Sequence, residues 1–305
     1  MLRFLVRRSA YNVVVLIGVL FVVNALLLMA GDPATALLPL NATEEQKQRI
    51  RADLDLDKPL PLQFLSFLGR AVRGDFGRSH SQGEGALGIV FDRLPTTLQL
   101  GGIALLMALV VGLALGAAAA LKPNTWVDHL SRTIAAFGSA VPQFWVGLML
   151  MLLLGVRFGW LPISGTGGVE YLIMPAITVA LPTIPPITRI FRSSLLGVVE
   201  RDYIRTARAK GLSGTRIFRK HIARNASLPV LTVVGFQVSS ILSSALVAEV
   251  IFAYPGMGRL AATAVSTRDL SVVQAFVFLA SSVVLITNML VDLGYALLDP
   301  RVRVR

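Results

Sequence analysis

Six long stretches of this sequence contain no charged residue, and this pattern constrains the fold more than any other feature. A helix that crosses ~30 Å of hydrocarbon needs about 20 predominantly apolar residues. Only 15% of the 305 residues are charged, compared with roughly 25% in soluble domains. The sequence therefore predicts an all-α membrane protein with six transmembrane helices, around Ser9–Gly31, Leu94–Leu121, Thr133–Val156, Tyr171–Thr188, Asn225–Ala248 and Leu270–Val291.

Neither a soluble helical protein nor a cleaved secretion signal fits these stretches as well. Buried helices of soluble proteins usually keep one polar face, but Gly102–Leu121 and Val272–Leu290 have no charged residue on any face. A cleaved secretion signal would need a shorter apolar region than Val13–Ala30 and a small residue at Leu28. We therefore expect the first stretch to be a retained membrane helix.

The positions of the basic residues predict the orientation in the membrane. With the N-terminus inside, 18 of the 29 lysines and arginines fall in cytoplasmic segments, ten of them within residues 189–224. The outer segments hold 11, of which eight lie in a loop of about 60 residues that also carries nine acids; such long loops have little influence on orientation. Both termini are thus expected in the cytoplasm. The net charge of +12 follows from this distribution and does not indicate a nucleic-acid partner.

The predicted spans divide the chain into three parts. Residues 1–31 form an N-terminal transmembrane helix, residues 32–93 an extracytoplasmic loop region, and residues 94–305 a core of five transmembrane helices. Within the loop region, Thr43–Asp53 is expected to be a helix that Thr43 and Gln46 open as a capping box. We expect this region to form a structured cap on the outer side of the membrane core.

Prolines and glycines distinguish two of the spans. The fourth carries four prolines, the first of them Pro175 and the last Pro186. A membrane helix tolerates such residues where neighbouring helices satisfy the freed carbonyl groups, so this span should be kinked and buried in protein. Gly112 and Gly116 form a GxxxG pair on the second span, which we interpret as close helix packing within this chain.

The segment between the fourth and fifth spans, residues 200–225, carries the most information on function. A first helix is expected over Arg201–Lys210 and ends at Gly211. Ser213 is placed to cap a second helix that runs to about Asn225. Such a short helix–glycine–helix unit at the membrane surface suits docking into a groove of another protein. Its charge alone favours the other interpretation, a solvated basic loop near anionic lipid.

The order of residues in this segment resembles the cytoplasmic "EAA" sequence of ABC importer permeases, in the dipeptide, oligopeptide and nickel branch. The match is carried by Tyr203-x-Arg-Thr-Ala-Arg-Ala-Lys-Gly-Leu212, followed by Arg224-Asn225 and Leu228-Pro229. The general pattern begins Glu-Ala-Ala, whereas this chain has Arg205, Thr206 and Ala207, a departure typical of that branch. Further stretches resemble the same permeases: Leu56–Gln63, Gly74–Ser79, Leu94–Thr97, Glu249–Arg259 and Val291–Arg301.

The resemblance implies a heteromeric importer in a bacterial cytoplasmic (inner) membrane. A second homologous permease would complete the pathway, two cytosolic ATPase subunits would bind ATP and Mg, and an extracytoplasmic substrate-binding protein would deliver the solute. The chain itself has no G-x-x-x-x-G-K-[ST] phosphate loop, so we expect no enzyme activity and no cofactor here. The residues expected to couple to the ATPase are Tyr203, Arg205, Thr206, Ala207, Ala209, Lys210, Gly211 and Leu212.

A second expected site follows the fifth span and would form the outer gate. It comprises Glu249, Tyr254, Pro255, Gly256 and Gly258. The two glycines are expected to adopt backbone angles that other residues disfavour. An acid near membrane depth is also a candidate proton carrier, and this would make the chain a secondary transporter. Because Glu249 lies near a span end, we interpret it as a brace for the turn.

Metal and catalytic sites find little support in the sequence. The chain has no cysteine and its three histidines are far apart, so neither a metal site nor a catalytic residue is predicted. The function that fits best is translocation of a small solute, with di- or oligopeptides favoured by the resemblance and nickel chelates or sugars left open. The alternative is a secondary carrier or channel that works alone.

Overall fold

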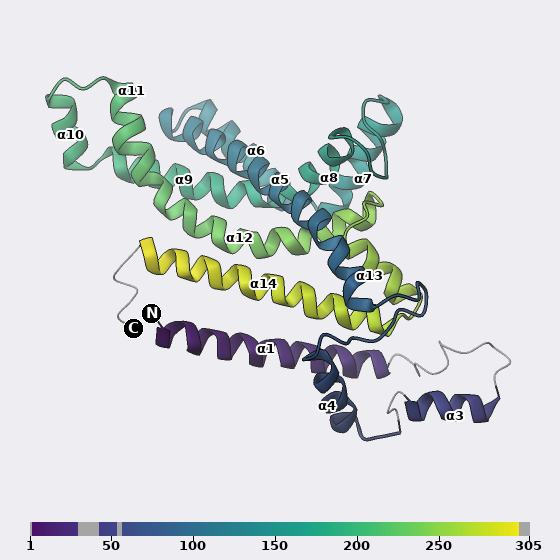
Figure 1. The fold of residues 1–305 in the computed structure, drawn as a ribbon. Helices are drawn as coiled ribbons and strands as arrows, with labels where there is room; N and C mark the ends of the chain where they lie inside the picture. Colours follow the sequence, from purple (N-terminus) through teal and green to yellow (C-terminus); the bar gives the residue numbers. More distant parts are fainter. Residues whose placement is uncertain (1, 30–42, 54–56, 299–305) are drawn as a thin grey trace. The chain divides into compact units, whose positions relative to one another are not determined.

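The computed structural model describes residues 2–29, 43–53 and 57–298, and helices account for all the named elements there (Figure 1). The boundary expected between the N-terminal helix (residues 1–31) and the loop region (residues 32–93) lies outside these ranges. The basic residues 301, 303 and 305 also lie outside them. The long helices are α1 Leu2–Met29, α5 Ala86–Leu121, α12 Ala223–Ile251 and α14 Leu270–Leu298. The shorter ones are α3 Glu44–Asp53, α4 Leu60–Ala71, α6 Trp126–Ala140, α7 Gln143–Leu150, α8 Glu170–Ala180, α9 Ile184–Val199, α10 Asp202–Ala209, α11 Gly214–Ile217 and α13 Met257–Ser266.

Five continuous helical stretches are long and apolar enough to cross a membrane: Arg7–Leu27, Ala86–Leu121, Glu170–Val199, Gly214–Ile251 and Leu270–Val291. The third expected span is instead two helical pieces, α6 and then α7 with the π-helical turn Met151–Arg157, bent by 102°. The bend falls at Val141 and Pro142, where proline cannot continue the hydrogen-bond ladder of α6. The prediction of six spans holds when this bent pair counts as one.

The chain divides into two compact units, each made of more than one segment. Among the described residues, unit 1 contains those up to Thr96 together with 255–290, and unit 2 contains 97–254 together with 291–298. The sequence predicts a boundary between the loop region, which ends at residue 93, and the core, which begins at residue 94. That boundary separates consecutive parts of the chain, whereas each unit combines distant segments, so it stays a prediction.

In unit 1, α1 and the first two thirds of α14 run side by side in opposite directions (Figure 1). The Gln274 side-chain amide donates to Asn24 Oδ1 at 2.7 Å, which satisfies two polar groups between these apolar helices. A row of aromatic contacts continues through the unit, with ring-centroid distances of 4.9–6.1 Å, along Phe21, Phe64, Phe67, Phe76 and Phe278. The segment that carries α4 and Phe76 is therefore packed on helices of unit 1, while its location outside the membrane and its role as a cap stay predictions.

The capping box expected at the start of α3 is present. The Thr43 amide donates to Gln46 Oε1 at 3.0 Å, and the Gln46 amide donates to Thr43 Oγ1 at 3.4 Å. These reciprocal bonds satisfy amides that have no partner within the helix.

In unit 2, the fourth span forms the centre of the core. About two thirds of its most apolar window is buried, against 28% or less in the other spans. A 3₁₀ turn at Leu181–Thr183 separates α8 from α9, which agrees with the kink expected from the prolines. A side-chain carbon at Gly112 would lie 2.8 Å from Ile187 Cγ2, and one at Gly116 would lie 2.9 Å from the Thr188 carbonyl oxygen. The glycine pair thus packs α5 against α9 within the chain, as predicted.

Candidate functional site

The expected coupling segment begins as a hairpin of helices at one end of unit 2 (Figure 1). Helix α10 covers Asp202–Ala209, and after a short turn the chain re-enters helix at Gly214. The expected second helix does not stop at Asn225. It passes through a π-helical turn, Phe218–Ile222, and continues as α12 to Ile251. The fifth span is thus mechanically continuous with one arm of the hairpin.

Side chains on both arms hold the hairpin together. The Asn225 side-chain amide donates to the Tyr203 hydroxyl at 3.1 Å. Ile204 is fully buried and Ala207 is 7% exposed, so both belong to the core of this chain. The expectation that Ala207 faces a partner is therefore not met by its position. The exposed members of the predicted coupling set are Tyr203, Arg205, Thr206, Ala209, Lys210 and Gly211.

The turn between the arms depends on Gly211. Its φ is +77°, and a side-chain carbon there would meet no atom within 4 Å. Only the backbone conformation, which L-residues rarely adopt, requires glycine at this position. Ser213 precedes the second arm with the extended backbone of an N-cap, but its side chain makes no capping hydrogen bond.

A hollow of about 750 Å³ lies between the hairpin and the ends of α5 and α9. Its wall is mostly apolar, and Glu200 and Arg208 are the charged side chains that line it. The apolar part is formed by Ala120, Leu121, Pro123, Leu195, Leu196, Val199, Leu212, Gly214, Ile217, Phe218 and Ile222. Ile204 and Ala207 of the hairpin remain packed in the core beside this hollow.

The first two residues of the predicted gate lie in unit 2. Glu249 is fully buried near the end of α12, and Tyr254 is 6% exposed. The Tyr254 amide donates to the Glu249 carbonyl oxygen at 2.9 Å. Burial, followed by the charge of Glu249, raises the pKa of the Tyr254 hydroxyl, so the phenol stays protonated at physiological pH.

The glycines of the predicted gate do not have the backbone angles that the sequence led us to expect. Gly256 has a φ of −93° and caps α13, while Gly258 lies within that helix. The left-handed residue of this turn is instead Ala253, with a φ of +50°. The bend after the fifth span therefore depends on Ala253. The sequence did not predict this, because the special backbone angles were expected at glycines.

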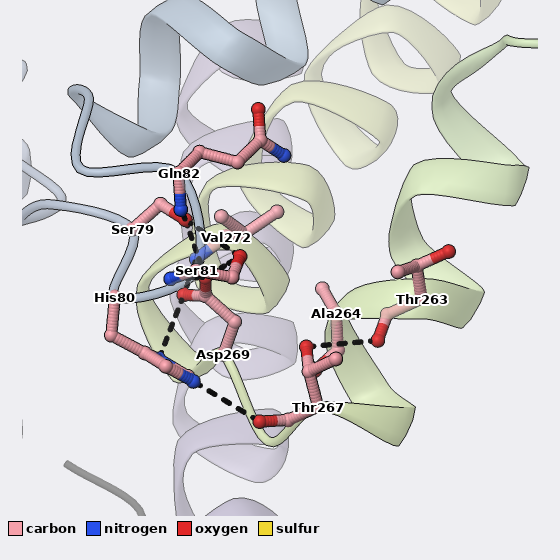
Figure 2. A network of polar contacts seen from close by, with 9 residues as sticks. All are labelled: Ser79, His80, Ser81, Gln82, Thr263, Ala264, Thr267, Asp269 and Val272. Carbon is pink, nitrogen blue, oxygen red and sulfur yellow. Dashed lines mark hydrogen bonds and ion pairs between the residues drawn. The ribbon is translucent and has the colours of Figure 1, made fainter.

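A polar network in unit 1, shown in Figure 2 and not predicted from the sequence, joins the outer segment to the turn between α13 and α14. Its centre is Asp269, which is 1% exposed. Asp269 Oδ2 accepts bonds from Ser79 Oγ at 2.5 Å and from Ser81 Oγ at 3.0 Å. Its Oδ1 lies 3.3 Å from the Val272 amide and caps α14. His80 Nε2 donates to the Thr267 carbonyl oxygen at 3.1 Å. We call these residues the outer clasp.

An ion pair in unit 2 was likewise not predicted. Asp128, near the start of α6, is 1% exposed and accepts two bonds from Arg192 on α9, at 2.8 and 2.6 Å. The Asn124 amide donates to the same carboxylate at 3.0 Å, and Arg132 Nε lies 3.5 Å from it. This pair ties two membrane helices and the short loop before α6 into one unit.

Neither network resembles a metal or catalytic centre. Over residues 2–29, 43–53 and 57–298, no group of three or more histidine, cysteine, aspartate or glutamate side chains is arranged to hold a metal ion. The two acids are bound by hydroxyl, amide and guanidinium donors, which makes them structural connections between segments.

Two family models together cover nearly the whole chain. Residues 112–304 match the family described as binding-protein-dependent transport system inner membrane component. Residues 1–101 match the N-terminal membrane component of binding-protein-dependent transport systems.

Curated relatives match over almost their full length. The chain is 37% identical to the di/tripeptide transport system permease protein DppB of Pseudomonas aeruginosa, and 33% identical to the oligopeptide transport system permease protein AppB of Bacillus subtilis, covering 99% of each pair. It is 36% identical to the glutathione transport system permease protein GsiC of Escherichia coli, covering 94% of this chain and 96% of that one.

Solved structures confirm the fold. An amino acid ABC transporter aligns with 68% of this chain and 92% of its own at a TM-score of 0.54 and 16% identity. The methionine transporter MetNI, in an inward-facing form, aligns with 67% and 93% at a TM-score of 0.53 and 15% identity. With an all-helical membrane fold and matches that run from end to end, the chain belongs to the family of inner-membrane permease components of binding-protein-dependent, ABC-type importers.

Proposed function

We propose that this permease translocates short peptides into the cytoplasm. The observation that carries the proposal is the 37% identity over 99% of both chains with a permease named for di- and tripeptides. Relatives named for oligopeptides and glutathione point to the same class of solute. In this proposal an extracytoplasmic binding protein delivers the peptide, a second homologous permease completes the pathway, and two cytosolic ATPases that bind ATP and Mg drive it.

The test is to purify this chain together with its proposed partner subunits and reconstitute them in lipid vesicles. ATP hydrolysis should rise when the binding protein is loaded with a di- or tripeptide, and labelled peptide should accumulate. Stimulation by a nickel chelate or a sugar, with none by peptides, would overturn the assignment of the solute. Uptake by the isolated chain without any ATPase would instead support a stand-alone carrier or channel.

The hairpin of residues 200–225 is the proposed contact with the ATPase. Its support is geometric: exposed Tyr203, Arg205 and Lys210 surround a tight turn, and the second arm continues without interruption into the fifth span. A displacement of the hairpin by the ATPase would be transmitted along α12 as a rigid element. Contact with a cytosolic ATPase requires the hairpin to be cytoplasmic. The distribution of basic residues predicts this location for the hairpin and for both chain termini.

Two glycines in the hairpin make a matched test of this role. Gly211 and Gly214 are both exposed with no atom within 4 Å of an added side-chain carbon, but only Gly211 has a positive φ. Gly211→Val should therefore distort the turn and abolish peptide uptake, whereas Gly214→Val should retain most of it. Lys210→Gln serves as a control for loss of charge. Normal uptake by Gly211→Val, with a defect only in Lys210→Gln, would show that the segment is a basic surface loop.

The outer gate at Glu249, Tyr254, Pro255, Gly256 and Gly258 is the second proposed site. Its support is the complete burial of Glu249 next to a turn held in a left-handed conformation. Glu249→Gln keeps the shape and removes the charge, so it should impair peptide uptake while leaving assembly intact. Unchanged uptake would show that the turn is only a connector.

A further inference from the structure

Helix α4 in unit 1 has apolar side chains on two opposite faces. The residues of the first face are buried in the unit: Phe64, Phe67 and Ala71. The residues of the second face are all more than half exposed: Leu62, Leu65 and Val72. Their separations of three and seven residues place them in one row along a helix, and Val72 continues the helical backbone as the C-cap of α4. We call Leu62, Leu65 and Val72 the aliphatic stripe.

The charged residues of this segment lie at the two ends of α4 and not on the stripe. Those that the structure shows as exposed are Asp57, Lys58, Arg70, Arg73 and Asp75. Gly69, between Leu65 and Val72 on the same face, has no atom within 4 Å of an added side-chain carbon. The stripe is therefore a continuous apolar surface that nothing in the described part of the chain covers, and such a surface indicates contact with lipid or with another protein.

The neighbour of α4 indicates what surrounds it. The ring of Phe64 lies edge-on to that of Phe21 in α1, with the centroids 5.2 Å apart. Phe21 belongs to the apolar span Arg7–Leu27, six residues before its end, which is about 9 Å along the helix at ~1.5 Å per residue. Only 11% of the most apolar window of this span is buried, and Val22 and Leu26 beside the contact are exposed. The apolar medium that surrounds α1 at this level therefore also meets α4.

The direction of α4 agrees with this location. Figure 1 shows α4 running across the direction of α1 instead of along it. Since α1 is a membrane span, a helix across its direction lies along the plane of the membrane. Helices that lie in the membrane interface bury their apolar face ~5–10 Å below the headgroup boundary, and the level of Phe21, about 9 Å from the end of its span, falls within this range.

We propose that α4 is an interfacial helix whose aliphatic stripe is covered by the acyl chains of membrane lipid, in the outer leaflet if both termini are cytoplasmic. The long side chains of Arg70 and Arg73 can then carry their charges to the lipid phosphates. A second permease or a binding protein is a less suitable occupant. Protein interfaces carry about one hydrogen bond per 100–200 Å², and the side chains of the stripe offer no donor or acceptor.

The absence of cysteine from the sequence allows a direct test. A nitroxide is attached to Leu62→Cys or Leu65→Cys in the chain, which is purified with the subunits that accompany it and placed in phosphatidylcholine nanodiscs. Collisions of the nitroxide with oxygen, which dissolves in acyl chains, are compared with collisions with nickel ethylenediaminediacetate, which stays in water. Glu84→Cys, exposed in the loop after α4, is the reference for water. A phosphatidylcholine with a nitroxide near the headgroup end of its chain is the reference for lipid.

Both stripe positions should show the oxygen-to-nickel ratio of the labelled lipid, well above the ratio at Glu84→Cys. Arg70→Cys, at the end of the same helix and beside the stripe, should show a lower ratio than Leu65→Cys. Frequent collisions with nickel at both stripe positions would place the stripe in water. Few collisions with either reagent would place a protein over it. Each of these two results contradicts the proposal, and so do equal ratios at Arg70→Cys and Leu65→Cys.

Discussion

Asp128 and Asp269 are both buried to 1% exposure, yet they are stabilised by different partners. Asp128 lies on a membrane helix and is held by the Arg192 guanidinium, with a second arginine nearby. Asp269 precedes α14 in the outer clasp, where the hydroxyl groups of Ser79 and Ser81 and a backbone amide donate to it, and His80 Nδ1 lies 3.7 Å from its Oδ1.

Both acids lie at the start of a helix, where free backbone amides are available. Asp128 is in the first turn of α6 and accepts from the Asn124 amide, and Asp269 caps α14 through the Val272 amide. The difference lies in what packs against each carboxylate. The Arg192 guanidinium of α9 offsets the cost of burying Asp128, whereas the hydroxyl groups of Ser79 and Ser81 donate to Asp269. Asp128 thus connects two helices through charge, and Asp269 connects a loop to a helix through hydrogen bonds.

The largest expected contrast between the two sites is their side of the membrane. Gln82 is exposed next to the outer clasp, and Lys122 is exposed in the loop before Asp128. With both termini in the cytoplasm, Gln82→Cys should react with an impermeant maleimide in intact cells, and Lys122→Cys only after the membrane is opened. Labelling of both positions from the same side would show that the orientation is wrong.

Removal of the cation at Asp128 should produce the next largest effect. Arg192→Met leaves a buried carboxylate with only its weaker contacts, and breaking such a pair costs about 3–5 kcal/mol. We expect a large loss of folded protein and a lower thermal midpoint in detergent. Arg189→Met removes the same charge from the same helix without breaking the pair, so it should be much milder. Equal losses in the two variants would show that Asp128 does not depend on Arg192.

The outer clasp should respond to Asp269 substitutions in two steps. Asp269→Ala removes the acceptor for both serines and the cap of α14, at a cost of about 1–3 kcal/mol. Asp269→Asn keeps one acceptor oxygen and should lose less. The readout is the labelling rate of Ser79→Cys, which is shielded in the parent chain because Ser79 is 1% exposed. If Asp269→Ala leaves Ser79→Cys as unreactive as before, the clasp does not hold the outer segment.

The smallest expected effect is the difference in stability between the Ser79→Ala and Ser81→Ala variants. Ser79 is buried, and its hydroxyl also accepts from the Gln82 amide at 3.1 Å. Ser81 is exposed, so water can replace its bond to Asp269. Ser79→Ala should therefore destabilise the purified protein by about 1 kcal/mol, and Ser81→Ala by clearly less. Thermal unfolding of the two variants side by side gives the comparison. A greater loss in Ser81→Ala would contradict the role of burial.

Several features of the fold could be read directly from the sequence. Runs without charge marked the apolar segments, because hydropathy acts locally on each helix that meets lipid. The capping box at Thr43 and the close packing at Gly112 and Gly116 were likewise predictable from spacing over three or four residues. The continuation of the fourth span through Arg189 and Arg192 was missed, because two arginines end a charge-free run but do not end a helix.

The candidate sites were less predictable than the spans. Ala207 was expected to face a partner and instead lies in the chain's own core, since the face that a short helix buries depends on what packs against it. The backbone angles expected at Gly256 and Gly258 are absent, and Ala253 has the left-handed conformation instead. Residue type favours a conformation, but the neighbouring structure decides where it occurs.

The sequence by itself determined the fold class, the number of apolar spans when the bent pair counts as one, and the family. These depend on hydropathy and on residue order within short windows. Only the tertiary structure decided the two buried aspartates, since Asp128 finds Arg192 64 residues away and Ser79 finds Asp269 190 residues away. A hydrogen bond acts over about 3 Å in space. No local pattern in a sequence records which distant segments will approach that closely.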